Sequence, residues 1–168
     1  DGKLIAFERL GSSGRWEIWM LPMDGDHKPY PYLQDQFQER HPAFSPDGKW
    51  LAFNCAYPDQ RRGLHKVRVG STEPRIKLNG MLCESCPAWS PDGKWLAFSV
   101  TSSEGIALWA AEVATGATMS LLGPVLNGVS GAPCTWWPDS SGLLCRTIPA
   151  GRGPAPAPAT IPTGPVVQ

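Results

Sequence analysis

Nine residues, SPDGKWLAF, occur twice in this chain without a change, at 45–53 and at 90–98. A shorter copy, DGKLIAF, lies at 1–7, and a degenerate fourth copy, WPDSSGLLC, lies at 137–145. Successive aspartates of the four copies are 46, 45 and 47 residues apart: Asp1, Asp47, Asp92 and Asp139. A period of about 46 residues with strand-like content is typical of a β-propeller, in which each repeat forms one blade.

The residues of each copy predict a β-hairpin. In the turn SPDG, proline presets φ for the first central position of a type I turn, and glycine accepts the left-handed conformation that follows. A four-residue loop at 46–49 pairs Ser45 with Trp50 and Phe44 with Leu51. The repeated turn residues are therefore interpreted as structural rather than catalytic: Asp47, Gly48, Asp92, Gly93 and Asp139.

The fourth copy departs from this pattern at its turn. Ser140 stands where the earlier copies have glycine, and we expect Gly142 to supply the flexibility one step later. A loop at 138–141 places Cys134 directly opposite Cys145 on the neighbouring strand. Such cross-strand pairs have Cβ atoms about 4.5–5.5 Å apart, whereas a disulfide requires about 3.8 Å, so we expect two free thiols.

Each period contains enough strand-like sequence for four strands, because two further β-rich runs follow every hairpin. The sequence predicts an all-β partial propeller of four-stranded antiparallel blades, about three and a half of them, cut as an arc from a larger ring. A proline-rich C-terminal tail completes the chain. The expected divisions are an incomplete blade at 1–37, blades at 38–82 and 83–128, the start of a further blade at 129–148, and the tail at 149–168.

Aromatic and basic side chains follow the same period. We interpret the tryptophans of the repeats as packing between sheets rather than as a ligand cage: Trp50, Trp89, Trp95 and Trp109. Basic residues gather between 61 and 77, where Lys66 and Arg68 alternate with valines. This alternation predicts a solvated outer strand, with phosphate binding as the alternative.

Cysteines and histidines provide the only candidate ligands. Five cysteines without regular spacing argue against a fold built on disulfides. Cys83 and Cys86 form a lone CxxC, and Cys86 lies one period after His41, so both enter the first strand of adjacent blades. Because those strands usually line the central channel, His41, Cys83 and Cys86 are candidate channel-lining residues. Zinc favours four ligands and a fourth is not apparent, so we expect reduced thiols, no metal and no cofactor.

Charge and motifs argue against several functions. With 15 basic and 15 acidic side chains the net charge is zero, which disfavours nucleic acids and membrane surfaces as partners. No apolar run approaches a membrane span and no signal peptide is evident, which leaves a periplasmic, secreted or cytoplasmic location open. The string GVSGA at 128–132 lacks the second glycine of a nucleophile elbow where it is required. We therefore expect no catalytic residue in this chain.

The SPDGKWLAF copies resemble the repeats of TolB-like β-propellers. The second half is similar to a narrower group, the N-terminal propellers of glutamyl-endopeptidase-like serine peptidases of the prolyl oligopeptidase family. The segment LLCRTIP and the proline-rich tail carry this similarity best, because simple repeats do not produce them. It covers about residues 86–168, whereas 1–85 resembles such propellers only at the level of the repeats.

In that family the propeller precedes an α/β-hydrolase domain, and none of its catalytic serine, aspartate and histidine positions has a match here. The resemblance implies a non-catalytic segment that gates a peptide substrate and supports the hydrolase domain of a parent peptidase. One alternative is a TolB-like propeller that binds proteins or peptides and has no enzymatic role; another is an engineered repeat fragment. Six prolines between 149 and 168 favour an extended tail without sheet pairing.

Overall fold

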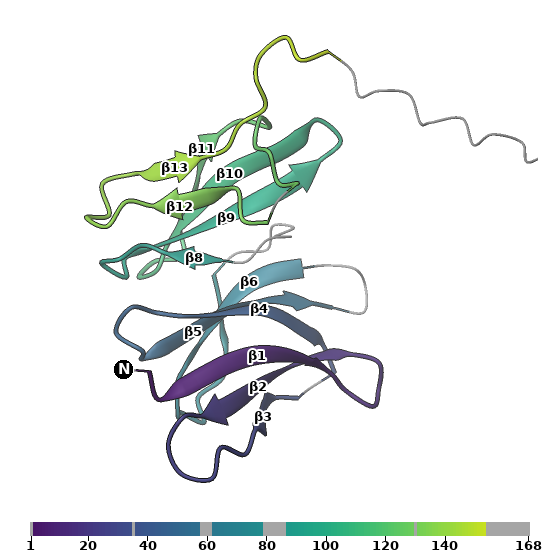
Figure 1. Cartoon of the computed structure of the whole chain (residues 1–168), viewed down its shortest axis with the longest axis vertical. Helices are drawn as coiled ribbons and strands as arrows, with labels where there is room; N and C mark the ends of the chain where they lie inside the picture. Colours follow the sequence, from purple (N-terminus) through teal and green to yellow (C-terminus); the bar gives the residue numbers. More distant parts are fainter. Residues whose placement is uncertain (1, 35, 58–61, 79–86, 130, 154–168) are drawn as a thin grey trace, which may run out of the picture.

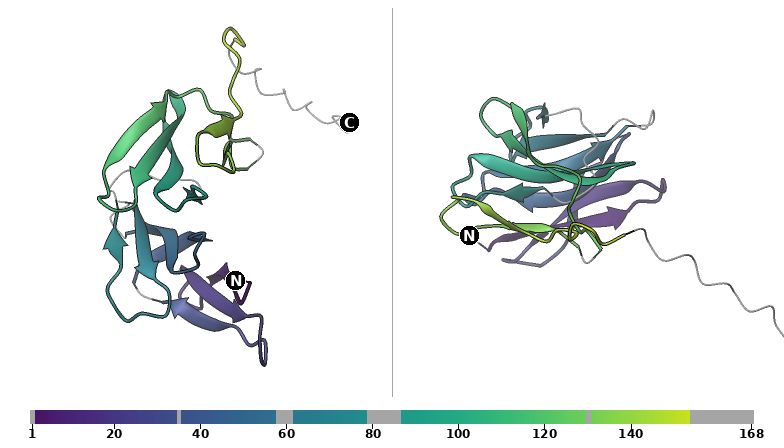
Figure 2. Two further views of the ribbon diagram at one scale, coloured as in Figure 1. Left: turned by 90° about the vertical axis from the view of Figure 1, so that its left-hand side faces the viewer. Right: turned by 90° about the horizontal axis from the view of Figure 1, so that it is seen from above.

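Four antiparallel sheets follow one another along an arc in the computed structural model of the chain (Figures 1 and 2). The structure describes residues 2–34, 36–57, 62–78, 87–129 and 131–153. These residues form strands, turns and loops and contain no helix. The predicted all-β architecture is therefore confirmed, while the predicted proline-rich tail lies largely outside the described residues.

All strand neighbours are consecutive in sequence and antiparallel. The first sheet contains β1 (Leu4–Leu10), β2 (Trp16–Pro22) and β3 (Tyr30–Leu33). The second contains β4 (Gln38–Phe44), β5 (Trp50–Ala56), β6 (Arg62–Arg68) and β7 (Ile76–Lys77). The third contains β8 (Ala88–Trp89), β9 (Trp95–Ser102), β10 (Gly105–Glu112) and β11 (Thr118–Leu122). The fourth contains β12 (Cys134–Trp136) and β13 (Leu143–Cys145).

The two identical copies of the repeat fold into matching turns. Phe44 pairs with Leu51, and the Ser45 amide donates to the Trp50 carbonyl at 2.8 Å, which confirms the predicted register. The Ser45 hydroxyl accepts from the Trp50 amide at 2.9 Å and donates to Asp47 Oδ1 at 2.7 Å. The same bonds recur at the same lengths in the second copy. Side chain and backbone thus close the loop together.

Glycine is required in both turns because the backbone is left-handed there. The φ angles of Gly48 and Gly93 are 70° and 73°. A Cβ at Gly48 would meet nothing within 4 Å, and one at Gly93 only an ordinary contact with Pro46. The demand for glycine is therefore one of backbone conformation and not of space.

We expect Gly48→Ala and Gly93→Ala each to lower the free energy of unfolding by about 1–2 kcal/mol, the usual cost of a left-handed L-residue. The two losses should agree closely, because the turns share their hydrogen bonds. Urea unfolding measures both. Gly123→Ala is the matched control, since that glycine also has open space around it but no positive φ. A loss at Gly123 as large as at Gly48 would contradict this explanation.

The fourth turn uses a different residue from the one predicted. Ser140 itself adopts the left-handed conformation, with φ of 64°, and Gly142 has no positive φ. The expectation that Gly142 supplies the flexibility is therefore wrong. The Ser140 hydroxyl accepts a hydrogen bond from the Asp92 amide at 3.0 Å, so the serine that departs from the repeat also connects this turn to the turn of the preceding sheet.

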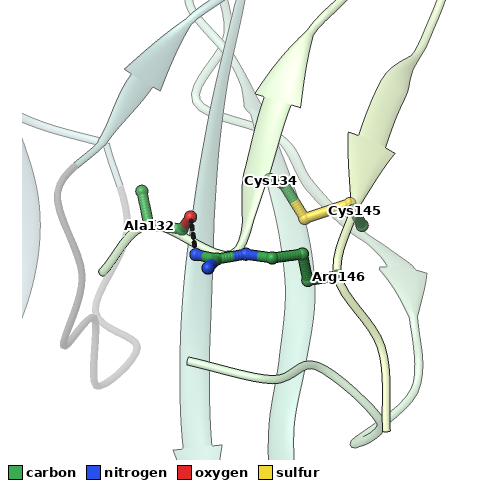
Figure 3. Close-up of a disulfide and its surroundings, with 4 residues drawn as sticks. All are labelled: Ala132, Cys134, Cys145 and Arg146. Atoms are coloured by element: carbon green, nitrogen blue, oxygen red, sulfur yellow. Dashed lines mark hydrogen bonds between the residues drawn. A yellow bond between two sulfur atoms is a disulfide. The ribbon is translucent and has the colours of Figure 1, made fainter. Parts of the chain in front are cut away.

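Cys134 and Cys145 pair across the β12–β13 hairpin, as the register predicted, but they form a disulfide (Figure 3). The expectation of free thiols is therefore wrong. The flanking hydrogen bonds explain why: the Arg146 amide donates to the Pro133 carbonyl, and the Trp137 amide to the Gly142 carbonyl. Cys134 and Cys145 thus occupy a non-hydrogen-bonded position, where strands approach more closely than average. Their Cα atoms are 4.1 Å apart.

Apolar clusters join each sheet to the next. The first two sheets share a cluster around Ile18, Met20, Leu51 and Phe53, and the second and third share one around Leu64, Leu96 and Phe98. Indole groups reinforce these contacts. The indole N–H of Trp89 donates to the Ala43 carbonyl, and that of Trp136 to the Ala88 carbonyl, each at 3.0 Å. One tryptophan per repeat thus connects neighbouring first strands.

Candidate functional site at the inner edge of the sheets

The first strands of successive sheets lie next to one another. β4 contacts β8, and β8 contacts β12, on the concave side of the arc (Figure 2, left). β4 and β8 are the edge strands of their four-stranded sheets, and β12 is one of the two strands that the described residues provide for the fourth sheet. Residues of β4 therefore lie on the concave side of the arc.

His41 occupies an irregular position on β4. Its φ is 56°, and the pairing with β5 shifts register between Arg40 and Ala43. A bulge of this kind bends the strand and redirects a side chain. The His41 amide, freed from the ladder, donates to Oε1 of Glu8 on β1 at 2.7 Å. A carboxylate of the preceding sheet thus holds the left-handed backbone of His41.

The His41 imidazole lies between an amide and a carboxylate. Asn54 Nδ2 is 3.2 Å from Nδ1, and Glu8 Oε1 is 3.9 Å from Nε2. Since the Asn54 amide donates, Nδ1 accepts and Nε2 carries the proton. Burial lowers the pKa of His41, and the Glu8 carboxylate opposes that shift. The site therefore presents a neutral, oriented imidazole that is able to donate a hydrogen bond from Nε2.

Arg40 completes this cluster on its exposed side. Its Nε donates to Glu8 Oε2 at 3.1 Å, and its guanidinium lies 4.8 Å from the centre of the Trp16 ring. Both carboxylate oxygens of Glu8 therefore take part: Oε1 contacts His41 and Oε2 contacts Arg40. The candidate site is the cluster of Glu8, Arg40, His41 and Asn54. It provides the His41 imidazole as a proton-carrying group, with the Arg40 guanidinium on the other side of the shared Glu8 carboxylate.

Replacing Glu8 by Gln should lower the pKa of His41 further, because it removes the carboxylate that opposes desolvation. The expected readout is an NMR titration in which the His41 ring signals move to a lower midpoint. His65 serves as the internal control, because its ring contacts the Tyr57 hydroxyl and the Gly63 carbonyl instead of Glu8. An unchanged His41 midpoint would show that Glu8 acts only on the backbone.

The turn aspartates accept hydrogen bonds from groups of their own turns. Asp47 Oδ1 accepts from the Ser45 hydroxyl and from the Lys49 amide at 3.1 Å, and Asp92 does the same in the second copy. Asp139 accepts from the amide and the hydroxyl of Ser141. These hydrogen bonds lower the pKa of all three carboxyl groups. In the structure, these three carboxylates help to close the turns in which they lie.

A buried ion pair was missed by the sequence analysis. Glu39 is fully buried, and its Oε1 accepts from Arg75 Nη1 at 3.0 Å, while Arg75 also reaches the Cys55 sulfur at 3.5 Å. Burial raises the pKa of Glu39 to about 7 and that of the Cys55 thiol to about 12. Cys55 is therefore an inert thiol, and Glu39 is the most strongly perturbed carboxyl group of the described chain.

Lys66 corrects the prediction of a solvated strand. It is only 8% exposed, and its Nζ donates to the Val113 carbonyl at 2.6 Å and lies 4.7 Å from the Trp50 ring centre. Burial lowers its pKa. Arg68 is exposed as expected. The prediction failed for Lys66 because β6 has a neighbouring sheet on each face, so alternation along it does not distinguish solvent from core.

Of the predicted channel-lining residues, only His41 can be placed. Cys83 and Cys86 lie outside the described residues, so their relation to His41 stays a prediction. Within the described ranges, no three His, Cys, Asp or Glu side chains are grouped closely enough to hold a metal ion. Across the same ranges, no helix is long and apolar enough to span a membrane.

Comparison with known proteins gives structural matches alone. No protein-family description fits the sequence, and no curated protein matches it. TolB from Acinetobacter baumannii matches with a TM-score of 0.68 and 19% identity, over 90% of this chain and 36% of TolB. Oligogalacturonate lyase in complex with manganese matches with a TM-score of 0.66 and 17% identity, over 86% of this chain and 42% of the lyase.

A peptidase also shares the architecture. Pyrococcus horikoshii acylaminoacyl peptidase matches with a TM-score of 0.54 and 13% identity, over 72% of this chain and 24% of the peptidase. Similarity at these identities establishes the fold, a β-propeller common to TolB, lyases and peptidases. The predicted likeness to TolB repeats and to peptidase propellers is confirmed at that level. The chain spans less than half the length of each of these proteins.

Proposed function

We propose that this chain is a non-catalytic segment of the β-propeller of a serine peptidase of the prolyl oligopeptidase family, where it gates peptide substrates and supports the hydrolase domain. The observation that carries the proposal is the use of the polar side chains. The aspartates close turns, and Trp89 and Trp136 connect sheets. Lys66 donates a hydrogen bond to the Val113 carbonyl, and Arg75 donates one to the buried Glu39. These contacts support the sheets, which is the role that we propose for the segment in a substrate gate.

Two further observations support the proposal that the parent protein is a peptidase. Residues 86–168 resemble glutamyl-endopeptidase-like propellers in sequence, and a peptidase shares the fold. The LLCRTIP segment of that resemblance includes β13 and continues to Thr147, which bridges to Leu126. The segment that carries this resemblance thus lies among the last described strands of the chain.

A fluorophosphonate probe tests this proposal in two samples. The chain by itself should show no serine labelling, and the longest natural polypeptide that includes it should be labelled and should hydrolyse peptides that contain glutamate. In that polypeptide, Trp136→Ala should increase hydrolysis of long peptides relative to short ones, because it loosens the gate. Labelling of the isolated chain, or its absence from the longer polypeptide, would overturn the proposal.

A TolB-like binding propeller is the second candidate. It is favoured by the extent of the match, since TolB covers 90% of this chain and the acylaminoacyl peptidase covers 72%. In this case the longer polypeptide would remain unlabelled and would bind peptides or proteins without cleaving them. The same labelling experiment therefore separates the two candidates.

A further inference from the structure

A cleft lies between the second and third sheets, at the edge where the two identical turns lie side by side. It has a volume of about 410 Å³. Residues of the turns at 46–49 and 91–94 form its two sides, and Trp50, Trp89 and Val113 complete its lining. Both sheets have four strands. The cleft is therefore a feature of the middle of the arc and does not depend on where the described residues end.

The next pair of sheets shows how two neighbouring turns are joined when a side chain is available. There, the Ser140 hydroxyl accepts a hydrogen bond from the Asp92 amide at 3.0 Å. Ser140 occupies the turn position that Gly48 and Gly93 occupy in the identical copies, and its φ of 64° is close to their 70° and 73°. A hydroxyl at this position thus satisfies the aspartate amide of the preceding turn.

At the cleft, the same position is a glycine and provides no hydroxyl. The Asp47 amide corresponds to that of Asp92, and Gly93 corresponds to Ser140. Gly93 faces the preceding turn in the same way, since a Cβ built on it would lie 3.9 Å from Pro46 Cδ. Among the described residues, the Asp47 amide has no hydrogen-bond partner. It is therefore able to donate to an oxygen atom that enters the cleft.

A buried cation lies directly behind the same cleft. Lys66 is 8% exposed, and its ammonium group contacts the Val113 carbonyl and the face of the Trp50 ring, which both belong to residues that line the cleft. In the described part of the chain, no carboxylate pairs with Lys66, and burial alone accounts for its lowered pKa. Buried charges are usually paired, so this ammonium group favours a negative charge nearby.

The other charged groups at the cleft largely cancel. The carboxylates of Asp47 and Asp92 also line it and would oppose an anion. Each of them, however, lies beside the ammonium group of its own turn, Lys49 at 3.4 Å and Lys94 at 3.5 Å. These two pairs are neutral, which leaves the charge of Lys66 uncompensated. The cleft therefore favours a ligand with a single negative charge.

We propose that this cleft binds a monocarboxylate with an apolar body. One carboxylate oxygen accepts from the Asp47 amide, at the place that corresponds to the Ser140 hydroxyl in the next pair of sheets. Lys66 compensates the charge, and the apolar body lies against Trp50 and Trp89. A few polar groups in a mostly apolar cleft are typical of small-ligand sites. A small organic acid and the C-terminus of a peptide both carry such a carboxylate, and the experiment separates these two sources.

Two carboxylates and their neutral amides are suitable probes. Phenylacetate represents a small acid, and N-acetylphenylalanine represents a peptide C-terminus. In a titration followed by amide NMR, at least one of them should move the Asp47 amide signal saturably. Phenylacetamide and N-acetylphenylalaninamide, which keep the ring and lack the charge, should not. The acid that binds more tightly identifies the source of the carboxylate. Equal binding of acids and amides would contradict a carboxylate site.

Gly93 provides a matched pair of variants that locates the site. Gly93→Ser should weaken binding of the acid roughly tenfold, because the introduced hydroxyl takes the hydrogen bond of the Asp47 amide. Gly93→Ala is the control, since it adds the same Cβ and the same left-handed strain without a hydroxyl, and it should keep most of the binding. Circular dichroism checks that both variants fold. Equal losses in the two variants would overturn the assigned hydrogen bond.

The charge of the site is tested separately at Lys66. Lys66→Met keeps the length and the apolar stem of the side chain, and loss of the ammonium group should weaken binding of the acid roughly tenfold. Lys28→Met is the control, because Lys28 is an exposed lysine of the first sheet that does not line the cleft. Unchanged binding in a folded Lys66→Met variant, or no saturable binding of either acid by the wild-type chain, would overturn the proposal. The proposal does not depend on whether the parent protein is a peptidase.

Discussion

Replacing Cys134 and Cys145 together by alanine is expected to lower the free energy of unfolding by about 2–3 kcal/mol, the usual contribution of a disulfide that closes a short loop. The bond joins residues 11 positions apart in the β12–β13 hairpin. An isolated two-stranded hairpin is marginally stable in water. The disulfide joins the two strands of this hairpin and therefore contributes much of the stability of the hairpin itself.

Urea unfolding of the oxidised protein and of the double variant measures this effect. Dithiothreitol should reduce the stability of the wild-type protein to that of the variant, and it should leave the variant unchanged. Cys55→Ala is the control for the loss of a buried thiol that forms no disulfide. A non-reduced mass spectrum in which the peptides of Cys134 and Cys145 carry free thiols would contradict the assigned bond.

Glu39 is expected to make the protein less stable as the pH rises from about 4.5 to about 7. Its pKa is 4.5 in an ordinary environment and about 7 in the folded protein, because burial disfavours its charge. The folded state therefore holds this proton after the unfolded state has lost it. The stabilisation is fully present below pH 4.5 and disappears as the pH passes 7. Its size is on the order of 3 kcal/mol.

The comparison with Glu39→Gln isolates this contribution. Burial lowers the pKa of His41 and of His65, so these histidines change the stability with pH in the opposite direction. The difference in unfolding free energy between the wild type and Glu39→Gln removes their effect. Glu104→Gln, on an exposed turn, is the control substitution. A difference that stays constant between pH 4.5 and 7.5 would mean that Arg75 keeps Glu39 ionised throughout.

The local parts of the fold could be predicted because they depend on residues close in sequence. The turn from Ser45 to Lys49 is determined by its own residues: a proline, a glycine and the serine–aspartate hydrogen bond. The register of Phe44 with Leu51 and of Cys134 with Cys145 follows from the loop length alone. The same reasoning underestimated how closely Cys134 and Cys145 approach, because it used an average distance for all cross-strand pairs.

The buried carboxylate could not be found in this way. Continued without interruption, the register of Phe44 with Leu51 would pair Glu39 with Ala56 and place it on the opposite face of the sheet. The bulge beside His41 moves the pairing by one residue, so Glu39 pairs with Cys55 and lies on the face of the second sheet that packs against the first sheet. That bulge depends on Glu8, which is 33 residues away in the chain. The candidate site therefore rests on a contact between repeats, which no single repeat contains.

The identity of the two SPDGKWLAF copies has a consequence for folding. β5 and β9 begin with the same four residues, so either strand offers the same edge to β6 or to β10. Their partners differ from the first residue of each strand, since Trp50 pairs with Arg68 and Trp95 with Glu112. Pairing β5 with β10 would require a loop roughly tenfold longer, at a cost of about 2 kcal/mol in chain entropy. Correct pairing within one molecule is thus favoured mainly because the correct partners are joined by short loops. This advantage does not apply between molecules, so a protein that refolds at high concentration should be prone to swap these strands between molecules.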